Sequence, residues 1–428
     1  MKLGRVSKNI IWIVAGKIAQ AVCAVIINAL TARYFGPSNY GLISYAASLV
    51  AFVTPLMQLG TRNIIVNELV KNPEKEGEVL GTSIAMTMCS SLACVLGLVS
   101  FVYIMDPTDR ITHAVVFLYS LLLFTQSLEL VQFWYNAKYL SKIVSLTSLA
   151  AYFITTGYKI FLLATEKGIH WFAISNALDH LMIAIVLLLI YRKKKGQRLR
   201  FSKHVLATMW RNGRPYIIPE MMGLVLQQSD RIMLRYAYGD GEVGLYSAAL
   251  TTASMACFVF EAITVSYSPM ILENKGKNEA AYEKSLTRLC GIVLYLSILQ
   301  CVFILLFGDY IIALMYGAAF AESSLMLKIV VCYTLFSNLG SVRALWILAE
   351  NKQRYLWYIS LFGMLLNVAL NAVMIKYYQG EGAAAATLIT QIFTNIILIA
   401  IIKPLRGNLI YIWRSLNIKN WIKSISEE

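Results

Sequence analysis

Long apolar runs recur from one end of this chain to the other, and they constrain its fold more than any other feature. An apolar run of about 18 residues or more is long enough for an α-helix to cross a bilayer core of about 30 Å. Only 14% of the residues are charged, whereas a soluble protein carries about 25%. We therefore predict an all-α polytopic membrane protein with about twelve transmembrane helices, at residues 10–33, 41–60, 80–104, 112–134, 143–164, 168–191, 214–235, 243–268, 288–308, 325–348, 355–376 and 383–403.

The basic residues are unevenly distributed between the two sides of these predicted spans. The formal net charge is +15, and most Lys and Arg residues fall in segments that are cytoplasmic if the chain begins there. The opposite side and its flanks carry only Arg33, Arg110, Lys167, Arg235, Lys328 and Lys376. This bias follows the positive-inside rule, so we predict that both termini are cytoplasmic. The same bias explains the net positive charge of the chain, so we expect no nucleic-acid partner.

A basic segment divides the predicted spans into two sets of six. Its sequence, YRKKKGQRLRFSKHVLATMWRNGR at residues 191–214, is the longest hydrophilic stretch after the first span. We predict an N-terminal six-helix lobe, a basic cytoplasmic linker, a C-terminal six-helix lobe and a cytoplasmic tail, at residues 1–191, 192–213, 214–405 and 406–428 respectively.

The two halves resemble each other at corresponding places. The stretch ARYFGPSNYGLISYAASL follows the first span, and LRYAYGDGEVGLYSAALT follows the seventh. Likewise EKGIHWFAISNAL opens the sixth span, and QGEGAAAATLIT opens the twelfth. Two matches in equivalent positions indicate a parallel repeat of six helices. Parallel repeats are a transporter architecture, in which substrate binds near the repeat interface.

Polar residues form stripes on several predicted spans. At 100° per residue, Lys17, Gln20 and Asn28 share one face of the first span, and Lys159 ends a similar stripe on the fifth. Such a lysine either faces a polar cavity or extends its amine to the membrane surface. The seventh span carries Glu220, Gln227 and Arg231 on one face.

Several charges lie inside predicted spans, where each costs about 2.5–3.5 kcal/mol on insertion scales. Structural ion pairs between helices are one explanation, which we favour for Asp230 with Arg231. The other explanation is a basic lining that attracts a pyrophosphate. We assign Lys17, Lys159, Arg231 and Arg343 to this lining, together with the polar Gln20, Asn28 and Gln227. Three acids could balance the charge or titrate as coupling sites, namely Asp179, Glu129 and Glu220.

No pattern in the sequence indicates catalysis or a bound metal. The seven cysteines and four histidines lack the spacing of a metal site, and no nucleophile–base pair is evident. We therefore predict a protein that is not an enzyme and has no metal or cofactor, apart from a possible coupling ion, H⁺ or Na⁺.

The order and spacing of several motifs resemble those of a known family. ARYFGPSNYGLISYAASLVAFVTPLMQLG is similar to the opening signature of bacterial polysaccharide-repeat-unit flippases, the Wzx-type branch of the multidrug/oligosaccharidyl-lipid/polysaccharide exporter superfamily. QQSDRIMLRYAYGDGEVGLYSAAL resembles the opening of that family's second half, and LLNVALNAVMIKYYQGEGAAAATLITQ resembles its C-terminal pattern. The resemblance runs from about residue 8 to about residue 405.

This resemblance implies a MATE-like fold of two six-helix lobes around a central cavity that opens alternately to each side. It implies a substrate of undecaprenyl-pyrophosphate-linked oligosaccharide, moved across the bacterial cytoplasmic membrane, with membrane lipids and polysaccharide polymerase machinery as partners. The positions that match the family pattern are Arg33, Gly36, Gly41, Asp230, Arg231, Gly244, Asn367, Asn371 and Gly382, and we expect the glycines to be structural.

Two other functions remain open at this point. A multidrug antiporter of the same superfamily would carry cationic amphiphiles and should have an acidic cavity, which the basic stripes argue against. A membrane glycan polymerase or glycosyltransferase would be expected to present larger loops than this chain has.

Overall fold

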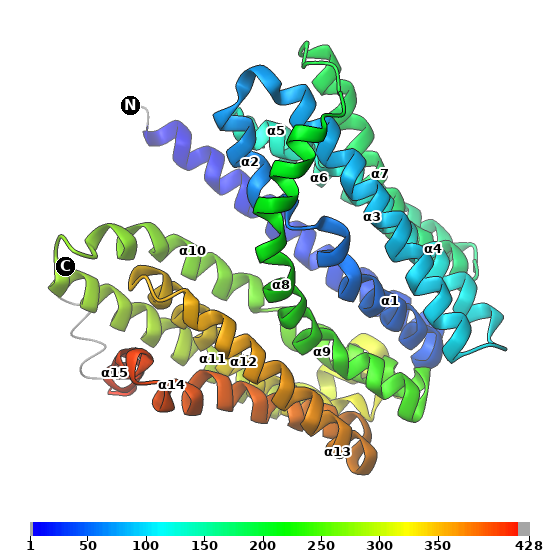
Figure 1. Ribbon diagram of the computed structural model, residues 1–428. Helices are drawn as coiled ribbons and strands as arrows, with labels where there is room; N and C mark the ends of the chain where they lie inside the picture. Colours follow the sequence, from blue (N-terminus) through cyan, green and yellow to red (C-terminus); the bar gives the residue numbers. More distant parts are fainter. Residues whose placement is uncertain (1–2, 418–428) are drawn as a thin grey trace. The chain divides into compact units, whose positions relative to one another are not determined.

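The computed structural model describes residues 3–417, with side chains described for residue 20 and for residues 23–417 apart from residue 63. The described residues form fifteen α-helices with short 3₁₀ and π-helical segments, and they contain no strand (Figure 1). The chain divides into two compact units, Met1–Gln228 and Ser229–Glu428, which we call the first and the second unit. The separate linker expected at residues 192–213 stays a prediction.

The first unit is a helical bundle in which α4 packs against α1, α3 and α7, while α6 packs against α1 and α7. Its buried core includes Leu80, Tyr135, Leu187 and Tyr191. The helices of this unit are α1 (Leu3–Gln58), α2 (Thr61–Lys71), α3 (Glu76–Met105), α4 (Arg110–Glu129), α5 (Gln132–Ala137), α6 (Ser141–Ala164), α7 (Ile169–Lys193) and most of α8 (Lys203–Tyr238).

The second unit is a bundle in which α12 packs against α9, α10, α11 and α13. A π-helical segment, Phe393–Ile397, continues the helix after α13. The helices of this unit are the end of α8, α9 (Asp240–Ser254), α10 (Cys257–Asn274), α11 (Glu279–Tyr316), α12 (Ser323–Ala349), α13 (Arg354–Ile392), α14 (Leu398–Ile401) and α15 (Gly407–Leu416).

Eight helical stretches of the described residues are long and apolar enough to cross a membrane, or nine if the bent pair α9–α10 is one span. All eight exceed the roughly 20 residues that one crossing needs. Two of them, Cys23–Gln58 and Arg354–Ile401, extend over parts of two expected spans. Each contains a residue with non-helical backbone angles, Gly36 and Gln379 respectively, near the expected junction of two spans. The all-α polytopic fold is confirmed, while the count of twelve stays a prediction.

The two units share local geometry at the places where their sequences match. Gly36 has φ 68° and ψ 177°, and Gly239, which follows the second Arg-Tyr pair, has φ 84° and ψ −175°. Only glycine adopts this backbone region readily, because it lacks a Cβ atom. In addition, Tyr34 Oη donates to the Lys167 carbonyl at 3.4 Å, and Tyr238 Oη donates to the Lys376 carbonyl at 2.7 Å. Both hydroxyls join the end of a half's first span to the turn before its last span.

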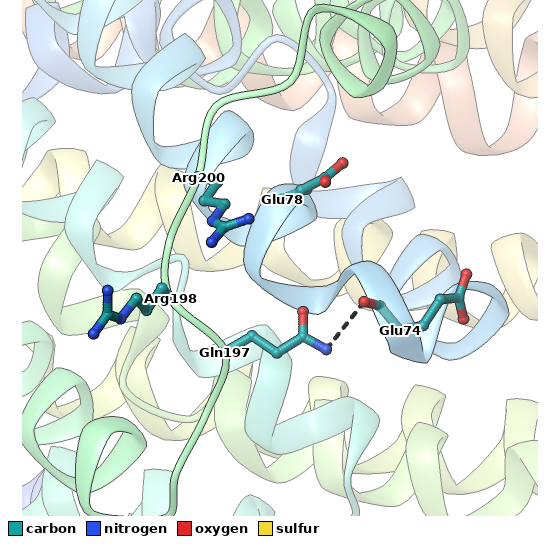
Figure 2. A pocket seen from close by; sticks show the side chains of 5 residues that line it. All are labelled: Glu74, Glu78, Gln197, Arg198 and Arg200. Carbon is teal, nitrogen blue, oxygen red and sulfur yellow. Dashed lines mark hydrogen bonds between the residues drawn. The ribbon is translucent and has the colours of Figure 1, made fainter.

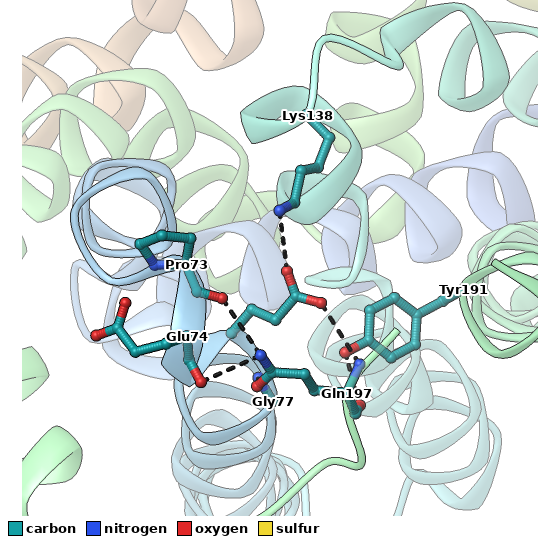
Figure 3. Close-up of polar contacts among 7 residues, drawn as sticks. Pro73, Glu74, Gly77, Lys138, Tyr191 and Gln197 are labelled. Atoms are coloured by element: carbon teal, nitrogen blue, oxygen red, sulfur yellow. Dashed lines mark hydrogen bonds and ion pairs between the residues drawn. The ribbon is translucent and has the colours of Figure 1, made fainter. Parts of the chain in front are cut away.

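The basic stretch between α7 and α8 is bound to the first unit along its length. Gln197 accepts from the Gly77 backbone N–H at 3.1 Å through Oε1, and its Nε2 donates to the carbonyls of Pro73 and Glu74 (Figure 3). Arg200 N donates to the Gly77 carbonyl at 3.0 Å. Residues 196–202 therefore form a fixed strap across the start of α3, and we call them the strap.

Side chains from both segments reinforce this contact. Glu76 accepts from the Gln197 backbone N–H and pairs with Lys138 Nζ at 3.2 Å (Figure 3). A surface pocket of about 290 Å³ lies alongside, lined by Glu74, Glu78, Gln197, Arg198 and Arg200 (Figure 2). The strap thus fixes the chain to the first unit immediately before α8 begins.

Gly77→Ala should weaken this attachment. A Cβ atom at residue 77 would lie 2.4 Å from the Arg198 carbonyl oxygen, so the strap must move away. We expect a net destabilisation of about 1–3 kcal/mol, typical of overpacking, and faster trypsin cleavage after Arg198 and Arg200. The matched control is Gly97→Ala on the same helix, where a Cβ meets nothing within 4 Å. Equal cleavage rates in the two variants would show that the strap is not held by this contact.

Candidate functional site

A small polar cavity lies inside the first unit, among α1, α6 and α7. Its volume is about 100 Å³, which is enough for several water molecules. Two of its lining residues, Ala24 and Ile27, are apolar, and the others carry amide, hydroxyl, amine and carboxyl groups. The lining residues are Ala24, Ile27, Asn28, Tyr152, Thr155, Thr156, Lys159, Asn176 and Asp179.

A neutral amide holds the Lys159 ammonium in this cavity. Lys159 Nζ donates to Asn176 Oδ1 at 3.0 Å, and Asn176 Nδ2 donates to Tyr119 Oη at 2.8 Å. Among the described residues, no carboxylate forms an ion pair with Lys159. Because an ammonium has three N–H donors, two remain for a ligand.

Two carboxylates belong to the same region of the first unit. Asp179 lines the cavity, and its Oδ1 accepts from Thr155 Oγ1 at 3.2 Å. Glu129, on α4, is buried and pairs with His180 Nδ1 on α7. The sequence analysis named both acids but overlooked His180, whose position next to Asp179 was the available signal. The three titratable groups are carried by two helices that pack together.

Helical spacing explains how these side chains meet. Tyr152, Thr155 and Lys159 recur every three or four residues on α6, and Asn176 and Asp179 do so on α7, so each set lies on one helix face. The two helices pack against each other, which brings the polar stripes together. The stripe expected on the fifth predicted span therefore faces the cavity, and Asn28 reaches it from α1.

A second polar cluster is buried inside the second unit around Asp230. Its carboxylate accepts from Tyr246 Oη at 2.6 Å, Asn371 Nδ2 at 2.6 Å and Thr387 Oγ1 at 2.9 Å. Asn367 Oδ1 accepts from Ser229 Oγ and from Asn371 Nδ2, each at 3.0 Å. Asp230 is only 3% exposed, so this acid is fully enclosed by neutral groups and by the neighbouring Arg231.

The composition of this cluster suits a small hard cation. Asp230, Asn367, Asn371 and Thr387 supply carboxylate, amide and hydroxyl oxygens, the ligands that such ions prefer. Asn371 Oδ1 is buried and has no hydrogen-bond partner, which is unusual for an amide in a protein interior. An unpaired oxygen beside a buried carboxylate is what a cation would need, so the residues fit the expected coupling ion.

The two clusters occupy related positions in the internal repeat. Asn28 lies five residues before Arg33, and Asp230 lies five residues before Arg235, the arginines of the two Arg-Tyr pairs. In both units the first span of the half and its last two spans contribute to the cluster, and in the second unit Tyr246 of α9 contributes as well. The chemistry differs, since the first unit presents an amine and the second a carboxylate.

Among the described residues, the other predicted binding residues do not line the cavity around Lys159. The side chain of Lys17 lies outside the described residues, although its backbone belongs to α1. Gln20 and Glu220 are half-buried and Gln227 is exposed. Arg231 Nε donates to Ser247 Oγ at 3.1 Å. Their assignment to one lining stays a prediction.

Arg343 joins α12 to the π-helical segment. Its Nη1 donates to the Thr394 carbonyl at 2.8 Å and to Asn395 Oδ1 at 2.7 Å, while its Nε is buried without a hydrogen-bond partner. A π-helical turn leaves carbonyls less tightly bonded within the helix, and such turns often occur at functional sites. The pyrophosphate contact assigned to Arg343 stays a prediction.

The family-pattern glycines have identifiable surroundings. Gly36 adopts the positive φ described above, while Gly41 and Gly244 are buried in their helices. At Gly382 a Cβ atom would lie 2.2 Å from the Met374 carbonyl oxygen, so no larger residue fits. Arg33 is exposed.

Solved structures of other proteins share this architecture. A lipid II flippase, MurJ, in an inward closed conformation superimposes with a TM-score of 0.71 at 17% identity, covering 98% of this chain and 93% of that one. An inward-facing multidrug resistance MATE family transporter of the MOP superfamily gives a TM-score of 0.65 at 12% identity, covering 94% and 95%. The expected MATE-like fold is confirmed, and it is the fold of a membrane transporter.

The sequence comparisons then define the family. The family model described as "Polysaccharide biosynthesis protein" matches residues 6–275, and the model described as "MatE" matches residues 215–373. The capsular polysaccharide biosynthesis protein CapF of Staphylococcus aureus is 20% identical over 397 residues, which cover 90% of this chain and 96% of that protein. The chain belongs to the polysaccharide biosynthesis protein family, and its expected membership of the multidrug/oligosaccharidyl-lipid/polysaccharide superfamily is confirmed.

Proposed function

We propose that this protein flips undecaprenyl-pyrophosphate-linked oligosaccharides from the cytoplasmic to the outer leaflet of the bacterial cytoplasmic membrane, for synthesis of a surface polysaccharide. The observation that carries the proposal is the Lys159 ammonium, which a neutral amide holds in an intramembrane cavity with donors left for an anion. The names of the relatives support it, since CapF is a capsular polysaccharide biosynthesis protein and MurJ is a lipid II flippase.

The physics of the cavity favours a phosphate ligand. A cation in a low-dielectric interior attracts a pyrophosphate far more strongly than the same cation in water. The neighbouring Asn28, Thr156 and Tyr152 offer the hydroxyl and amide groups that bind sugars. In this proposal Lys17 and Arg343 meet the pyrophosphate first, and Lys159 and Arg231 contact it later, while the polyprenyl tail remains in lipid. No covalent step is required.

Transport must enlarge the cavity, because about 100 Å³ is far too small for an oligosaccharide. The helix α8 offers a place for the necessary bend. Its Met209 is buried in the core of the first unit, and its Leu234 is buried in the second unit. Pro215 and Pro219 lie between them, and each removes a backbone hydrogen bond from the helix. We propose that the units rock about this proline-containing stretch.

We further propose that the Asp230 cluster binds the coupling ion, Na⁺ or H⁺. Asp230, Asn367, Asn371 and Thr387 would hold the ion, which would add positive charge beside a buried carboxylate that accepts hydrogen bonds from the neutral Tyr246, Asn371 and Thr387. The carboxylates of the first unit, Asp179 and Glu129, are less suited, because Lys159 and His180 lie close to them.

A multidrug antiporter is the second candidate function. The likeness to MATE transporters and the buried Asp230 favour it, because an acidic interior attracts organic cations. The cavity around Lys159 opposes it, since an ammonium repels such substrates. A glycan polymerase or glycosyltransferase has no specific observation in its support.

Mass spectrometry of lipids that remain bound during gentle purification tests the proposed function. We expect polyprenyl-pyrophosphate sugars with the native protein, depleted about 10-fold in Lys17→Ala, since a charged hydrogen bond contributes about 1.5–3 kcal/mol. Lys71→Ala, at the exposed end of α2, is the control and should retain them.

The outcomes separate the candidates. Equal retention by all three proteins would mean that Lys17 extends to the membrane surface, with the flippase proposal intact. Absence of such lipids, together with competition by organic cations for the native protein, would overturn the proposal in favour of the antiporter.

A further inference from the structure

The last described helix, α15, has its polar and apolar sides reversed relative to a helix in water. Its buried side chains include Asn408, Tyr411 and Ser415. Its outward side chains include Ile410 at 51%, Trp413 at 73% and Leu416 at 50% exposure. A surface helix of a soluble protein turns its apolar face toward the core. The side that α15 turns away from the rest of the protein is therefore partly apolar.

Specific contacts hold α15 in this orientation against α11. Tyr295 Oη donates to the carbonyls of Ser415 at 2.9 Å and Leu416 at 3.3 Å, and Arg414 Nη1 pairs with Glu283 at 2.6 Å. The two bonds from Tyr295 satisfy carbonyls at the helix end that have no partner within the helix. The exposed apolar face therefore results from a well-bonded arrangement of the helix.

The same contacts define the level of α15 along α11. Glu283 and Tyr295 are twelve residues apart, about 18 Å along a helix. Between them lies Arg288, the last basic residue before a long apolar stretch with exposed Leu299 and Leu306. The two anchors thus bracket the transition from charged to apolar surface, which in a membrane protein marks the boundary between headgroups and hydrocarbon.

We propose that α15 lies in the plane of the membrane interface, with Ile410, Trp413 and Leu416 inserted at the level where headgroups meet acyl chains. Arg406 and Arg414 flank this apolar stripe and are exposed; Arg414 pairs with Glu283, so Arg406 is the one of the two that is offered to lipid phosphates. Tryptophan is enriched at such interfaces, and apolar stripes bordered by basic residues are typical of helices that lie on membranes.

Lipid is a better occupant of this face than another protein. The apolar stripe continues the exposed apolar surface of α11, which the bilayer covers in a membrane-spanning helix. The charge of the flanking Arg406 is complementary to the phosphates of phospholipids. This proposal requires only that the protein spans a membrane, and it does not depend on which substrate is carried.

Fluorescence quenching in nanodiscs tests the proposal on the full chain. The Trp413 signal is the difference between the native protein and Trp413→Phe, measured in bilayers of phosphatidylcholine and phosphatidylglycerol. We expect lipids brominated near the headgroup end of the acyl chain to remove at least half of this signal, and lipids brominated near the chain end to remove less. Aqueous iodide should quench it less than twofold. The control is the difference signal between the native protein and Trp346→Phe. Trp346 is only 2% exposed, so neither quencher should reach it.

Each other outcome overturns the proposal. Strong quenching by iodide without quenching by brominated lipid would show that α15 faces water. A Trp413 signal protected from both quenchers would show that protein covers this face, and the mass of the particle would then distinguish a second copy from a different partner. Equal quenching by shallow and deep bromines would show that α15 enters the hydrocarbon core.

Discussion

Replacing Lys159 with methionine is expected to slow flipping of a lipid-linked oligosaccharide by about 10- to 100-fold. Among the described residues that line the cavity, the Lys159 ammonium is the one group that can donate charged hydrogen bonds to a pyrophosphate. A hydrogen bond to a charged group contributes about 1.5–3 kcal/mol, and 1.4 kcal/mol corresponds to a factor of ten. Methionine is similar in length and apolar, so it can occupy the same space without the charge.

The measurement is the rate at which a purified lipid-linked oligosaccharide crosses the bilayer of proteoliposomes, at concentrations below saturation. Lys159→Arg keeps the charge and should retain more activity than Lys159→Met. The matched control is Lys142→Met, the same substitution at the exposed start of the same helix, which should flip at the native rate. If Lys159→Met also flips at the native rate while binding its lipid, Lys159 only links α6 to α7 through Asn176.

The sequence predicted the architecture well because membrane insertion depends on hydrophobicity averaged over a whole helix. Apolar runs indicated an all-α membrane chain and the repeated Arg-Tyr motif a parallel repeat, while the MATE-like fold was implied by the family resemblance. The break between spans was also visible, since Gly36 adopts the conformation that a glycine in that turn allows. The position of each span was predicted less well, because hydropathy does not determine where one span ends and the next begins. Arg354–Ile401, for example, is one continuous apolar stretch in the structure.

The candidate site was predicted only in part, because its contacts depend on how helices are rotated against each other. Spacing placed Lys159 on a polar stripe of α6, but nothing in the sequence paired Lys159 with Asn176 or Glu129 with His180. The partners of Asp230 lie 16, 141 and 157 residues away, at Tyr246, Asn371 and Thr387.

One sequence signal for these clusters was available and unused. Asn28 and Asp230 lie at the same offset from the two Arg-Tyr pairs, so the repeat itself relates a polar residue in each half. The strap was hidden for a different reason. A basic, Gly-containing stretch such as residues 192–200 is typical of a flexible linker, and its bonds involve mainly backbone groups of Gly77 and Glu74 that no side-chain pattern reveals.

Asp230→Asn is expected to abolish ion-coupled transport while leaving the fold intact. In the native protein Na⁺ should raise the melting temperature, because an ion bound only to the folded state adds about 2.7 kcal/mol at 100 times its dissociation constant. The variant should lose this Na⁺-dependent shift and the dependence of flipping on an ion gradient. The measurement is thermal unfolding in NaCl against KCl at equal ionic strength, followed by flipping with and without a gradient.

The structure explains why Asp230→Asn should fold. The new amide places an N–H₂ group where Asp230 now accepts from Asn371, and a flip of the Asn371 side chain would turn its unpaired Oδ1 toward that donor. The substitution also removes a buried charge, so the melting temperature without Na⁺ should not fall. The control is Asp309→Asn, an acid with 70% side-chain exposure in the same unit. A native protein whose stability responds to pH and not to Na⁺ would identify the ion as a proton, whereas an Asp230→Asn variant that keeps full coupling would move the ion site to Asp179 or Glu129.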